Sequence, residues 1–407
     1  MQISKELLSN LAKSSGLLPQ EEMLEVARKK GALFIGIPKE TSYQENRVAL
    51  VPEAVLVLVS NGHRVLVETG AGINSSFQDK DYSEAGAEIA YSTEEVFKAD
   101  LILKVAPVNE TEIVLLQRKQ TIISALNLSM QSQTYFRALL DKKINAIAYE
   151  NIMDDEGTFP VIRAIGEIAG NTSILIAAEQ MATGSGGVGA MFGGISGVAP
   201  TQVVIIGAGT VGENAARAAL GLGASIKIFD NSISRLRRLQ SNLGQKLYTS
   251  VLNPTELANA LSTADVAIGA LRNRGAGQAP CVVTEEMVEN MKYGAVIIDV
   301  AIDQGGCFET SQVTNHQKPT FRKYGVVHYC VPNIASRVPK TASHALSNVF
   351  MPILNYIGEE SGLENMLRVD AGVRNGLYTY NGVLTNKYIG QMFSLPYTEI
   401  DLLMAAF

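Results

Sequence analysis

The chain has 407 residues, of which 46% are hydrophobic and 18% are charged, and its formal net charge is −6. This length favours about two domains, and the apolar content is sufficient for a sizeable core. The negative net charge and the lack of a basic block argue against a nucleic-acid partner.

The cysteines and the N-terminus indicate the compartment. Cys281, Cys307 and Cys330 have neither the spacing of metal ligands nor that of a disulfide framework, so we predict no metal site and a reducing environment. The first 30 residues lack an apolar segment long enough for a signal peptide and are predicted to form a helical extension. These features together predict a cytoplasmic protein.

The first part of the chain alternates short apolar runs, typical of buried strands, with helical patterns. Strands are predicted at residues 33–37, 64–68, 88–92, 101–105, 121–126 and 145–150. Helices are predicted at 52–62 and 133–143. Alternation of this kind is typical of a parallel sheet with helices on both faces.

The middle of the chain is apolar and rich in glycine. Residues 164–182 are predicted to form a long apolar helix that leads into the next domain. No charged residue occurs from Gln180 to Gly212, but this stretch contains ten glycines and Pro200, so it could not satisfy its backbone hydrogen bonds in lipid. We predict that it forms buried loops and a strand, and that the protein has no membrane partner.

A dinucleotide-binding fingerprint follows. The apolar run at 203–206 leads into Gly207, Gly209 and Gly212, which have the G-x-G-x-x-G spacing, and then into an Ala-rich helix. A second strand is predicted at 226–229 and ends at Asp230. The glycines allow a tight turn and a close backbone approach to a pyrophosphate, and the terminal carboxylate accepts hydrogen bonds from the adenosine ribose. We therefore predict NAD as cofactor, in preference to NADP, because Asp230 would repel a 2′-phosphate.

The same alternation continues to the end of the chain, with strands predicted at 265–270, 295–301 and 326–331 and a helix at 341–360. We predict an α/β protein with two doubly wound parallel-sheet (Rossmann-like) domains and a cleft between them. The last helix is expected to return to the first domain. The substrate domain is then discontinuous, 1–163 plus 338–407, and 164–337 forms the NAD-binding domain.

Ligands of open parallel sheets bind beyond the carboxyl ends of the strands. This rule selects a short set of polar residues near predicted strand ends, namely Glu40, Glu45, Arg47, Lys104, Asn127 and Asp303. We expect Arg47, Lys104, Asn127 and Asp303 to line one cleft.

At this point a family resemblance is clear. The chain resembles the alanine dehydrogenases and the related alpha subunit of nicotinamide nucleotide transhydrogenase in GIPKETSYQENRVALVPEAV (36–55), GHRVLVETGAG (62–72), DYSEAGAEI (81–89), ADLILKV (99–105), GEIAGN (166–171), GGISGVAP (193–200), the glycine loop, VIIDVAIDQGGCFET (296–310) and HYCVPN (328–333). The IDQGGCFET segment favours the alanine dehydrogenase branch. The resemblance implies reversible oxidative deamination of L-alanine to pyruvate and ammonia with NAD, in a homo-oligomer that is usually a hexamer.

The resemblance also implies roles for individual residues. Arg47 matches the arginine that holds the substrate carboxylate, although a surface ion pair with Glu45 is the simpler alternative. Asp303 matches an acid near the nicotinamide and the amino group, with a loop cap beyond the strand as the alternative. Lys104 and Asn127 are candidate catalytic and substrate-binding residues. The cofactor site comprises Gly207, Ala208, Gly209, Thr210, Val211, Gly212, Asp230, Asn231, Arg235, Ala270, Leu271, Val300, Asp303 and Asn333.

Two departures from the family pattern concern the chemistry directly. The family has a second, substrate-contacting lysine two residues after Lys104, where this chain has Ala106. It has a histidine acid/base at the position of Asn127, and an asparagine amide cannot exchange a proton near neutral pH. The family serine in the segment aligned with GEIAG is Gly166 here.

Alternatives therefore stay open. The histidines His63, His316, His328 and His344 are each weak candidates for the missing acid/base, since a lone histidine is more often structural or solvated. The chain could be an alanine dehydrogenase with a weakened active site. It could instead be an opine-type reductase acting on another 2-oxo acid or amine, or a non-catalytic NAD-binding protein.

Overall fold

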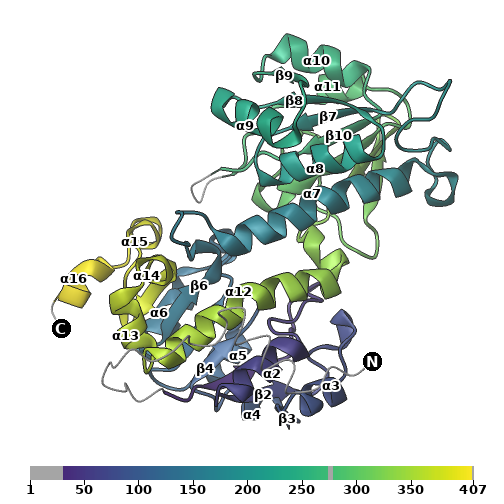
Figure 1. The fold of residues 1–407 in the computed structure, drawn as a ribbon. Coiled ribbons are helices and arrows are strands. Elements are labelled where there is room, and N and C mark those ends of the chain that lie inside the picture. The colour runs from purple at the N-terminus through teal and green to yellow at the C-terminus, as the bar shows by residue number, and fades with distance from the viewer. Residues whose placement is uncertain (1–30, 274–277, 406–407) are drawn as a thin grey trace. The chain divides into compact units, whose positions relative to one another are not determined.

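The computed structural model describes residues 31–273 and 278–405, so the predicted N-terminal helical extension lies outside the described residues. The chain divides into two compact units, Met1–Ile162 with Pro339–Phe407 and Arg163–Val338. Each unit contains one mostly parallel sheet with helices packed on it (Figure 1). The predicted fold class, two parallel-sheet α/β units, is thereby confirmed.

The sheet of the first unit has the strand order β15-β14-β6-β5-β4-β1-β2-β3. Its strands are β1 (Phe34–Ile37), β2 (Arg64–Glu68), β3 (Glu88–Ala90), β4 (Leu101–Leu103), β5 (Thr121–Ser124), β6 (Asn145–Ala148), β14 (Leu377–Tyr380) and β15 (Val383–Leu384). The first six are parallel, whereas β14 runs antiparallel to both β6 and β15. The C-terminal part of the chain thus extends the sheet by two antiparallel strands.

The helices of the first unit come from both ends of the chain. They are α2 (Pro52–Ser60), α3 (Asp79–Glu84), α4 (Thr93–Val96), α5 (Glu110–Leu115), α6 (Gln133–Asp141), α12 (Pro339–Glu359), α13 (Leu363–Val369), α14 (Ala371–Gly376), α15 (Lys387–Phe393) and α16 (Ile400–Ala405). Helix α12 packs against α2, and two of its serines accept backbone N–H bonds from the loop before α2. Val48 donates to Ser343 Oγ at 2.9 Å and Val51 to Ser347 Oγ at 2.8 Å. These buried bonds tie the C-terminal segment to the loop that carries Arg47.

The second unit has the strand order β12-β13-β11-β10-β7-β8-β9. Its strands are β7 (Gln202–Ile206), β8 (Ser225–Phe229), β9 (Tyr248–Ser250), β10 (Val266–Gly269), β11 (Val296–Asp299), β12 (Thr320–Lys323) and β13 (Val326–Tyr329). All neighbours are parallel except β12 and β13. The order reverses between β7 and β10, which is the switch point where such sheets bind ligands.

Two apolar layers cover the faces of this second sheet. Its helices are α7 (Pro160–Met181), α8 (Thr210–Gly221), α9 (Ile233–Leu243), α10 (Pro254–Ser262) and α11 (Glu285–Glu289). Helices α7, α8 and α9 pack on one face, where Ile205 and Ile228 point, and α10 and α11 pack on the other, where Val204 and Phe229 point. This alternation along each strand follows from the two-residue period of β structure and gives the doubly wound arrangement.

Several predicted strands are shorter in the structure, and some edges were missed. The pattern predicts strands through Ala301 and Val331, but β11 ends at Asp299 and β13 at Tyr329. Apolar residues continue past the carboxyl ends because the following loops are also buried, so hydrophobicity alone does not define the last paired residue. The short strands β9, β12 and β15 lie at sheet edges and lack a long apolar run, since an edge strand is paired on one side only. Strand β14, between β6 and β15, was missed as well.

The glycine-rich stretch before the phosphate loop does not form buried loops, so that prediction was wrong for residues 182–200. Val188, Met191, Ile195 and Val198 are more than half exposed, and only a short part of this segment is buried. Glycines leave little side-chain surface to bury, so this segment lies at the surface despite its apolar composition. Among the described residues, α7 is the single helix long and apolar enough to cross a membrane, and half of that stretch is buried within the protein.

Candidate active site

The glycine loop joins β7 to α8 in a conformation that requires its glycines. Gly207 has φ of 116°, and its N–H donates to the Phe229 carbonyl at 2.7 Å. A Cβ on Gly212 would lie 1.8 Å from the Gly207 carbonyl oxygen, so this position admits no larger residue without a shift of the backbone. Gly209 is the N-cap of α8, and no heavy atom lies within 4 Å of where its Cβ would be.

This geometry fits the pyrophosphate of a dinucleotide. The space beside Gly209 leaves the backbone N–H groups at the start of α8 open to a ligand, and Thr210 and Val211, the first helical residues, are only partly buried. The N-terminus of a helix of this length also carries a partial positive charge. The residues present therefore form the cradle that the sequence predicts for NAD.

Asp230 lies at the end of β8, next to the glycine loop. Its side chain is almost fully buried; Oδ2 accepts from the Ala208 N–H at 2.8 Å and Oδ1 from the Ser232 N–H at 2.7 Å. Arg235 Nη1 lies 3.6 Å from Oδ2. The predicted ribose-binding residues Asp230 and Arg235 are thus brought together, whereas the side-chain oxygen of Asn231 accepts the N–H of Leu252 at 3.2 Å and serves the loop.

The carboxyl end of β10 completes this side of the cradle. Ala270 donates its N–H to the Ile206 carbonyl at 2.8 Å. A Cβ on Gly207 would lie 2.5 Å from the Ala270 carbonyl oxygen, so the glycine also allows the close approach of the two strand ends. Leu271 is the buried residue that follows. Ala270 and Leu271 therefore adjoin the glycine loop, as the resemblance implies.

The loop after β11 carries Asp303 on a short 3₁₀ helix, Val300–Gln304. Asp303 is exposed, and its Oδ1 accepts the N–H of Asn333 at 3.0 Å. Asn333 has φ of 55°, a left-handed conformation that asparagine tolerates. The structure therefore brings together Asp303 and Asn333, and Val300 lies at the start of the same short helix.

Sequence reasoning missed Asp299, which holds this loop in place. Its carboxylate is buried and accepts the N–H groups of Ala301 at 3.1 Å and Cys307 at 2.9 Å and the Ser311 hydroxyl at 2.6 Å. Burial raises its pKa, although these hydrogen bonds oppose the shift. We interpret Asp299 as the residue that positions Asp303. Its place at the carboxyl end of β11 was the available signal.

In the first unit, Arg47 is buried and held by Glu45. Nε donates to Glu45 Oε1 at 2.7 Å and Nη2 to Oε2 at 2.6 Å, and the Glu45 carboxylate also accepts the Arg47 N–H at 3.0 Å. Burial alone lowers the pKa of Arg47, but Glu45 outweighs this effect and the net shift is upward. The ion pair that the sequence suggested is therefore present, but it is buried and bidentate. It leaves the Nη1 edge of the guanidinium for a further carboxylate.

Lys104 directly follows β4 and is almost fully buried between two carboxylates. Its Nζ lies 2.5 Å from Glu112 Oε1 and 3.4 Å from Glu40 Oε2. Burial lowers the pKa of Lys104, but the attraction of Glu40 and Glu112 exceeds this effect and raises it overall. Lys104 is therefore a charged member of a buried network. Glu112 was not singled out from the sequence because it lies on α5, away from any strand end.

Glu40 connects this network to Ala106, the position at which the family has a second lysine. Its Oε1 accepts the Val105 N–H at 2.6 Å, and its Oε2 accepts the Ala106 N–H at 3.4 Å. Burial raises the pKa of Glu40 from 4.5 to about 7, with Lys104 opposing the shift. Ala106 itself is buried and adds no polar group.

Asn127 follows β5 and is exposed. Because β5 runs parallel to β4, it lies past the same edge of the sheet as Lys104. It has φ of 44°, and its N–H donates to Glu150 Oε1 at 3.3 Å, which also accepts the Leu126 N–H at 2.7 Å. Tyr149, the residue before Glu150, donates its hydroxyl to the Val105 carbonyl at 2.6 Å, and burial raises its pKa. Val105 thus connects Tyr149 to Glu40, so Asn127 and Lys104 belong to one hydrogen-bonded region of the first unit. Arg47 lies near enough for Tyr149 and Glu40 to influence its pKa.

Two histidines have clear structural roles. His328 is fully buried and bonded to Thr310 Oγ1 at 2.8 Å, and burial lowers its pKa to about 4. His63 is buried, accepts the Leu33 N–H at 3.2 Å, and has a lowered pKa because of burial. His344 is half-buried and forms a T-shaped ring contact with Phe77, and His316 is half-buried in the loop before β12.

The network around Glu40 predicts a pH dependence of stability. Because the folded state holds the Glu40 proton more tightly than the unfolded chain does, its contribution is fully present below pH 4.5 and is lost as the pH rises through about 7. We expect a loss on the order of 3 kcal/mol across this range, and we expect Glu40→Gln to remove this part of the slope. Urea unfolding from pH 4.5 to 8 measures it, with exposed Glu53→Gln as the matched control. A slope that persists in Glu40→Gln would contradict the assignment.

Two family models together match most of the chain. Residues 36–169 match the family model "Alanine dehydrogenase/PNT, N-terminal domain", and residues 173–387 match "Alanine dehydrogenase/PNT, C-terminal domain". The chain is 42% identical over 370 residues to the alanine dehydrogenase of Bacillus subtilis, covering 91% of this chain and 97% of that protein. It is 39% identical over 374 residues to the alanine dehydrogenase of Mycolicibacterium smegmatis, covering 92% of this chain and 100% of that protein.

Solved structures show the same relationship. An L-alanine dehydrogenase superposes with a TM-score of 0.83 at 37% identity, covering 88% of this chain and 99% of that chain. A transhydrogenase from Sinorhizobium meliloti, at 24% identity and a TM-score of 0.74 over 87% of this chain and 99% of its own, shares the fold. The predicted resemblance is confirmed: the chain belongs to the alanine dehydrogenase/PNT family.

Proposed function

We propose that this chain is an NAD-dependent oxidoreductase of the alanine dehydrogenase type, which interconverts L-alanine with pyruvate and ammonia. The observation that carries the proposal is the dinucleotide cradle of Gly207, Gly209 and Gly212 beside the buried carboxylate of Asp230. The relatives named alanine dehydrogenase supply the substrate class.

The second unit would hold the cofactor. The start of α8 would bind the pyrophosphate through its N–H groups, Asp230 would accept the ribose hydroxyls, and Asp303 with Asn333 would face the nicotinamide side. NAD held there would supply the hydride acceptor for the oxidation of the substrate carbon. Asp303 would stabilise the positive charge of the iminium that forms on the substrate, and Asp299 would keep Asp303 in place through the loop.

Arg47 would bind the substrate carboxylate. Glu45 holds the guanidinium rigidly through Nε and one N–H of Nη2, so the rotamer entropy of the arginine is already lost before substrate binds. The Nη1 edge then offers donors in a fixed plane. Lys104 is held between Glu40 and Glu112. Its positive charge would lie near the carbonyl oxygen of the 2-oxo acid and would polarise that carbonyl.

A second candidate function follows from Ala106 and Asn127. Without the family lysine and histidine, the first unit lacks the family's acid/base group, and Asn127 offers only a hydrogen-bonding amide on the exposed side of the strand ends. A changed pair of this kind is what a changed substrate would require. The alternative is therefore an opine-type reductase for another 2-oxo acid or amine, and an NAD-binding protein without turnover is the third possibility.

We further propose an assembly and a cellular setting. The discontinuous unit, 1–163 plus 338–407, would act as the substrate domain and 164–337 as the NAD-binding domain. Arg47, Lys104 and Asn127 would serve the substrate from the first, and Asp303 from the second. The resemblance suggests a homohexamer, and the cysteine usage suggests the cytoplasm. Size-exclusion chromatography with light scattering tests the assembly.

An amination assay tests the function. The purified full chain is incubated with NADH, ammonia and a panel of 2-oxo acids, and oxidation of NADH is followed by absorbance. We expect turnover of pyruvate that is weak compared with a typical enzymatic rate of about 10 s⁻¹. Faster turnover of another 2-oxo acid, or of an amino acid as the amine donor, would favour the opine-type alternative. NADH binding without any turnover would favour the non-catalytic one.

A further inference from the structure

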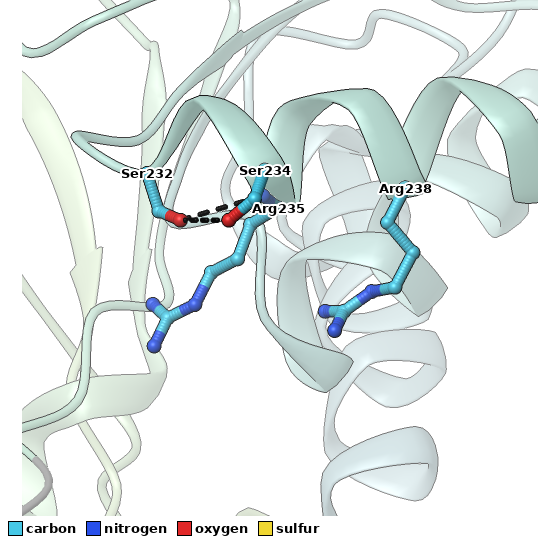
Figure 2. A pocket seen from close by; sticks show the side chains of 4 residues that line it. All are labelled: Ser232, Ser234, Arg235 and Arg238. Carbon is cyan, nitrogen blue, oxygen red and sulfur yellow. Dashed lines mark hydrogen bonds between the residues drawn. The ribbon is translucent and has the colours of Figure 1, made fainter.

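A basic pocket lies at the start of α9, next to the carboxylate of Asp230. It is lined by Ser232, Ser234, Arg235 and Arg238 (Figure 2). Arg235 and Arg238 are three residues apart on the helix, so their side chains leave it on the same side. Figure 2 shows both guanidinium groups extending to that side, with the Ser232 and Ser234 hydroxyls bonded to each other at 2.9 Å.

From the sequence, the negative charge of Asp230 is expected to repel the 2′-phosphate of NADP. The structure shows that this charge has partners nearby. The Asp230 carboxylate already accepts two backbone N–H groups and lies 3.6 Å from Arg235, so its negative charge is largely compensated. Arg238 is exposed, and in the part of the chain that the structure describes it forms no ion pair. Two guanidinium groups therefore line this pocket, and that of Arg235 lies close to the one neighbouring carboxylate, Asp230.

The position of the pocket selects its ligand. A residue at the end of the second strand contacts the adenosine ribose in this fold, and an arginine next to it is the usual means of accommodating a 2′-phosphate. A phosphate monoester carries close to two negative charges and three acceptor oxygens, which match two guanidinium forks and nearby hydroxyl groups. No acidic residue contributes to the lining of the pocket.

We propose that this pocket binds the 2′-phosphate of NADP(H), so that the chain accepts NADP(H) as a second cofactor besides NAD(H), with Arg235 and Arg238 as the phosphate ligands. The inference rests on the proposed cofactor site. Asp230 still favours a free ribose, so NADH is expected to bind more tightly than NADPH, but Arg238 makes the phosphorylated cofactor acceptable.

The test uses the full chain and compares two neighbouring arginines. NADH and NADPH are titrated by nucleotide fluorescence against wild type, Arg238→Ala and Arg237→Ala. Arg237 is exposed on the same helix but does not line the pocket, so it controls for the loss of one positive charge. We expect Arg238→Ala to lower NADPH affinity about 10-fold or more and to leave NADH affinity unchanged. We expect Arg237→Ala to change neither by a comparable factor.

Three results would overturn the proposal. Wild type that binds NADH but not NADPH excludes the phosphate site. Equal losses of NADPH affinity in the two variants show a general charge effect only. Thermal stabilisation by inorganic phosphate that depends on Arg238, without NADPH binding, shows a site for free phosphate. If neither cofactor binds wild type, the proposed function itself fails, and this outcome is separate from the first three because the NADH titration reports it.

Discussion

Replacing Asn127 by histidine and Ala106 by lysine should raise the rate of pyruvate amination by about 10²-fold or more, because a positioned acid/base typically contributes 10²–10⁴ in rate. The backbone at position 127 is left-handed, and histidine tolerates this conformation nearly as well as asparagine. Ala106 lies next to the Glu40 carboxylate, which accepts its N–H, so a lysine there would have a carboxylate close to its backbone. The backbone at position 127 therefore suits histidine, and Glu40 offers a lysine at position 106 a nearby counter-charge.

The two substitutions should be non-additive, since both groups would act on one substrate. Steady-state kinetics of the two single variants and the double variant measure the coupling, and NADH titration provides the control. NADH affinity should stay constant, because it depends on the glycine loop and Asp230 in the other unit. Wild type that already turns over alanine at about 10 s⁻¹ would refute the argument that the chemistry is lost. Another residue would then transfer the proton, and His316 and Lys104 would be tested first.

The second large effect is expected in the glycine loop, where two Gly→Ala substitutions should separate folding from cofactor binding. Gly212→Ala places a methyl group 1.8 Å from the Gly207 carbonyl oxygen, so the loop and helix must move apart. Overpacking of this kind costs about 1–3 kcal/mol, which lowers the melting temperature by about 2–10 °C for a domain of this size. NADH affinity should fall as well, because the cradle is displaced.

Gly209→Ala should leave the melting temperature nearly unchanged but weaken NADH binding. No heavy atom lies within 4 Å of the new methyl group, and the backbone at Gly209 is extended, so the fold should tolerate it. The methyl group would occupy the space where the pyrophosphate approaches the N–H groups, and the loss of charged hydrogen bonds should weaken NADH binding about 10–100-fold.

Gly221→Ala is the matched control at the other end of α8, where the methyl group also meets open space. It should change neither the melting temperature nor the affinity for NADH. Calorimetry and fluorescence titration of the three variants provide both readings. A Gly209→Ala variant that binds NADH like wild type would show that the loop does not contact the pyrophosphate.

The sequence was sufficient for features that depend on neighbouring residues. The glycine spacing, the helix after it and Asp230 lie within one strand-helix-strand segment, so their geometry follows from local backbone requirements. The alternation of apolar runs and helical patterns predicted two α/β sheets for the same reason. The family resemblance identified Ala106 and Asn127 as departures, because an ungapped spacing from Lys104 suffices to align them.

Only the tertiary structure decided which charges meet. The buried ion-pair network joins residues from three places: Glu40 follows β1, Lys104 follows β4, and Glu112 lies on α5. Because β1 and β4 are neighbours in the sheet, these side chains come within ion-pair distance. The burial raises the pKa of Glu40, which no sequence pattern indicates. In the same way, Asp299 controls the loop of Asp303 through bonds to residues that follow it by several positions.

Asp230 shows what the sequence and the tertiary structure each determine at a single residue. The sequence alone determined that Asp230 ends the second strand of a dinucleotide fold, because that follows from spacing. The structure decided that the carboxylate is compensated by two N–H groups and by Arg235, and that Arg238 faces the same pocket. The physical reason is that charge compensation depends on side-chain direction and distance in three dimensions, whereas spacing along the chain determines only which residues are available.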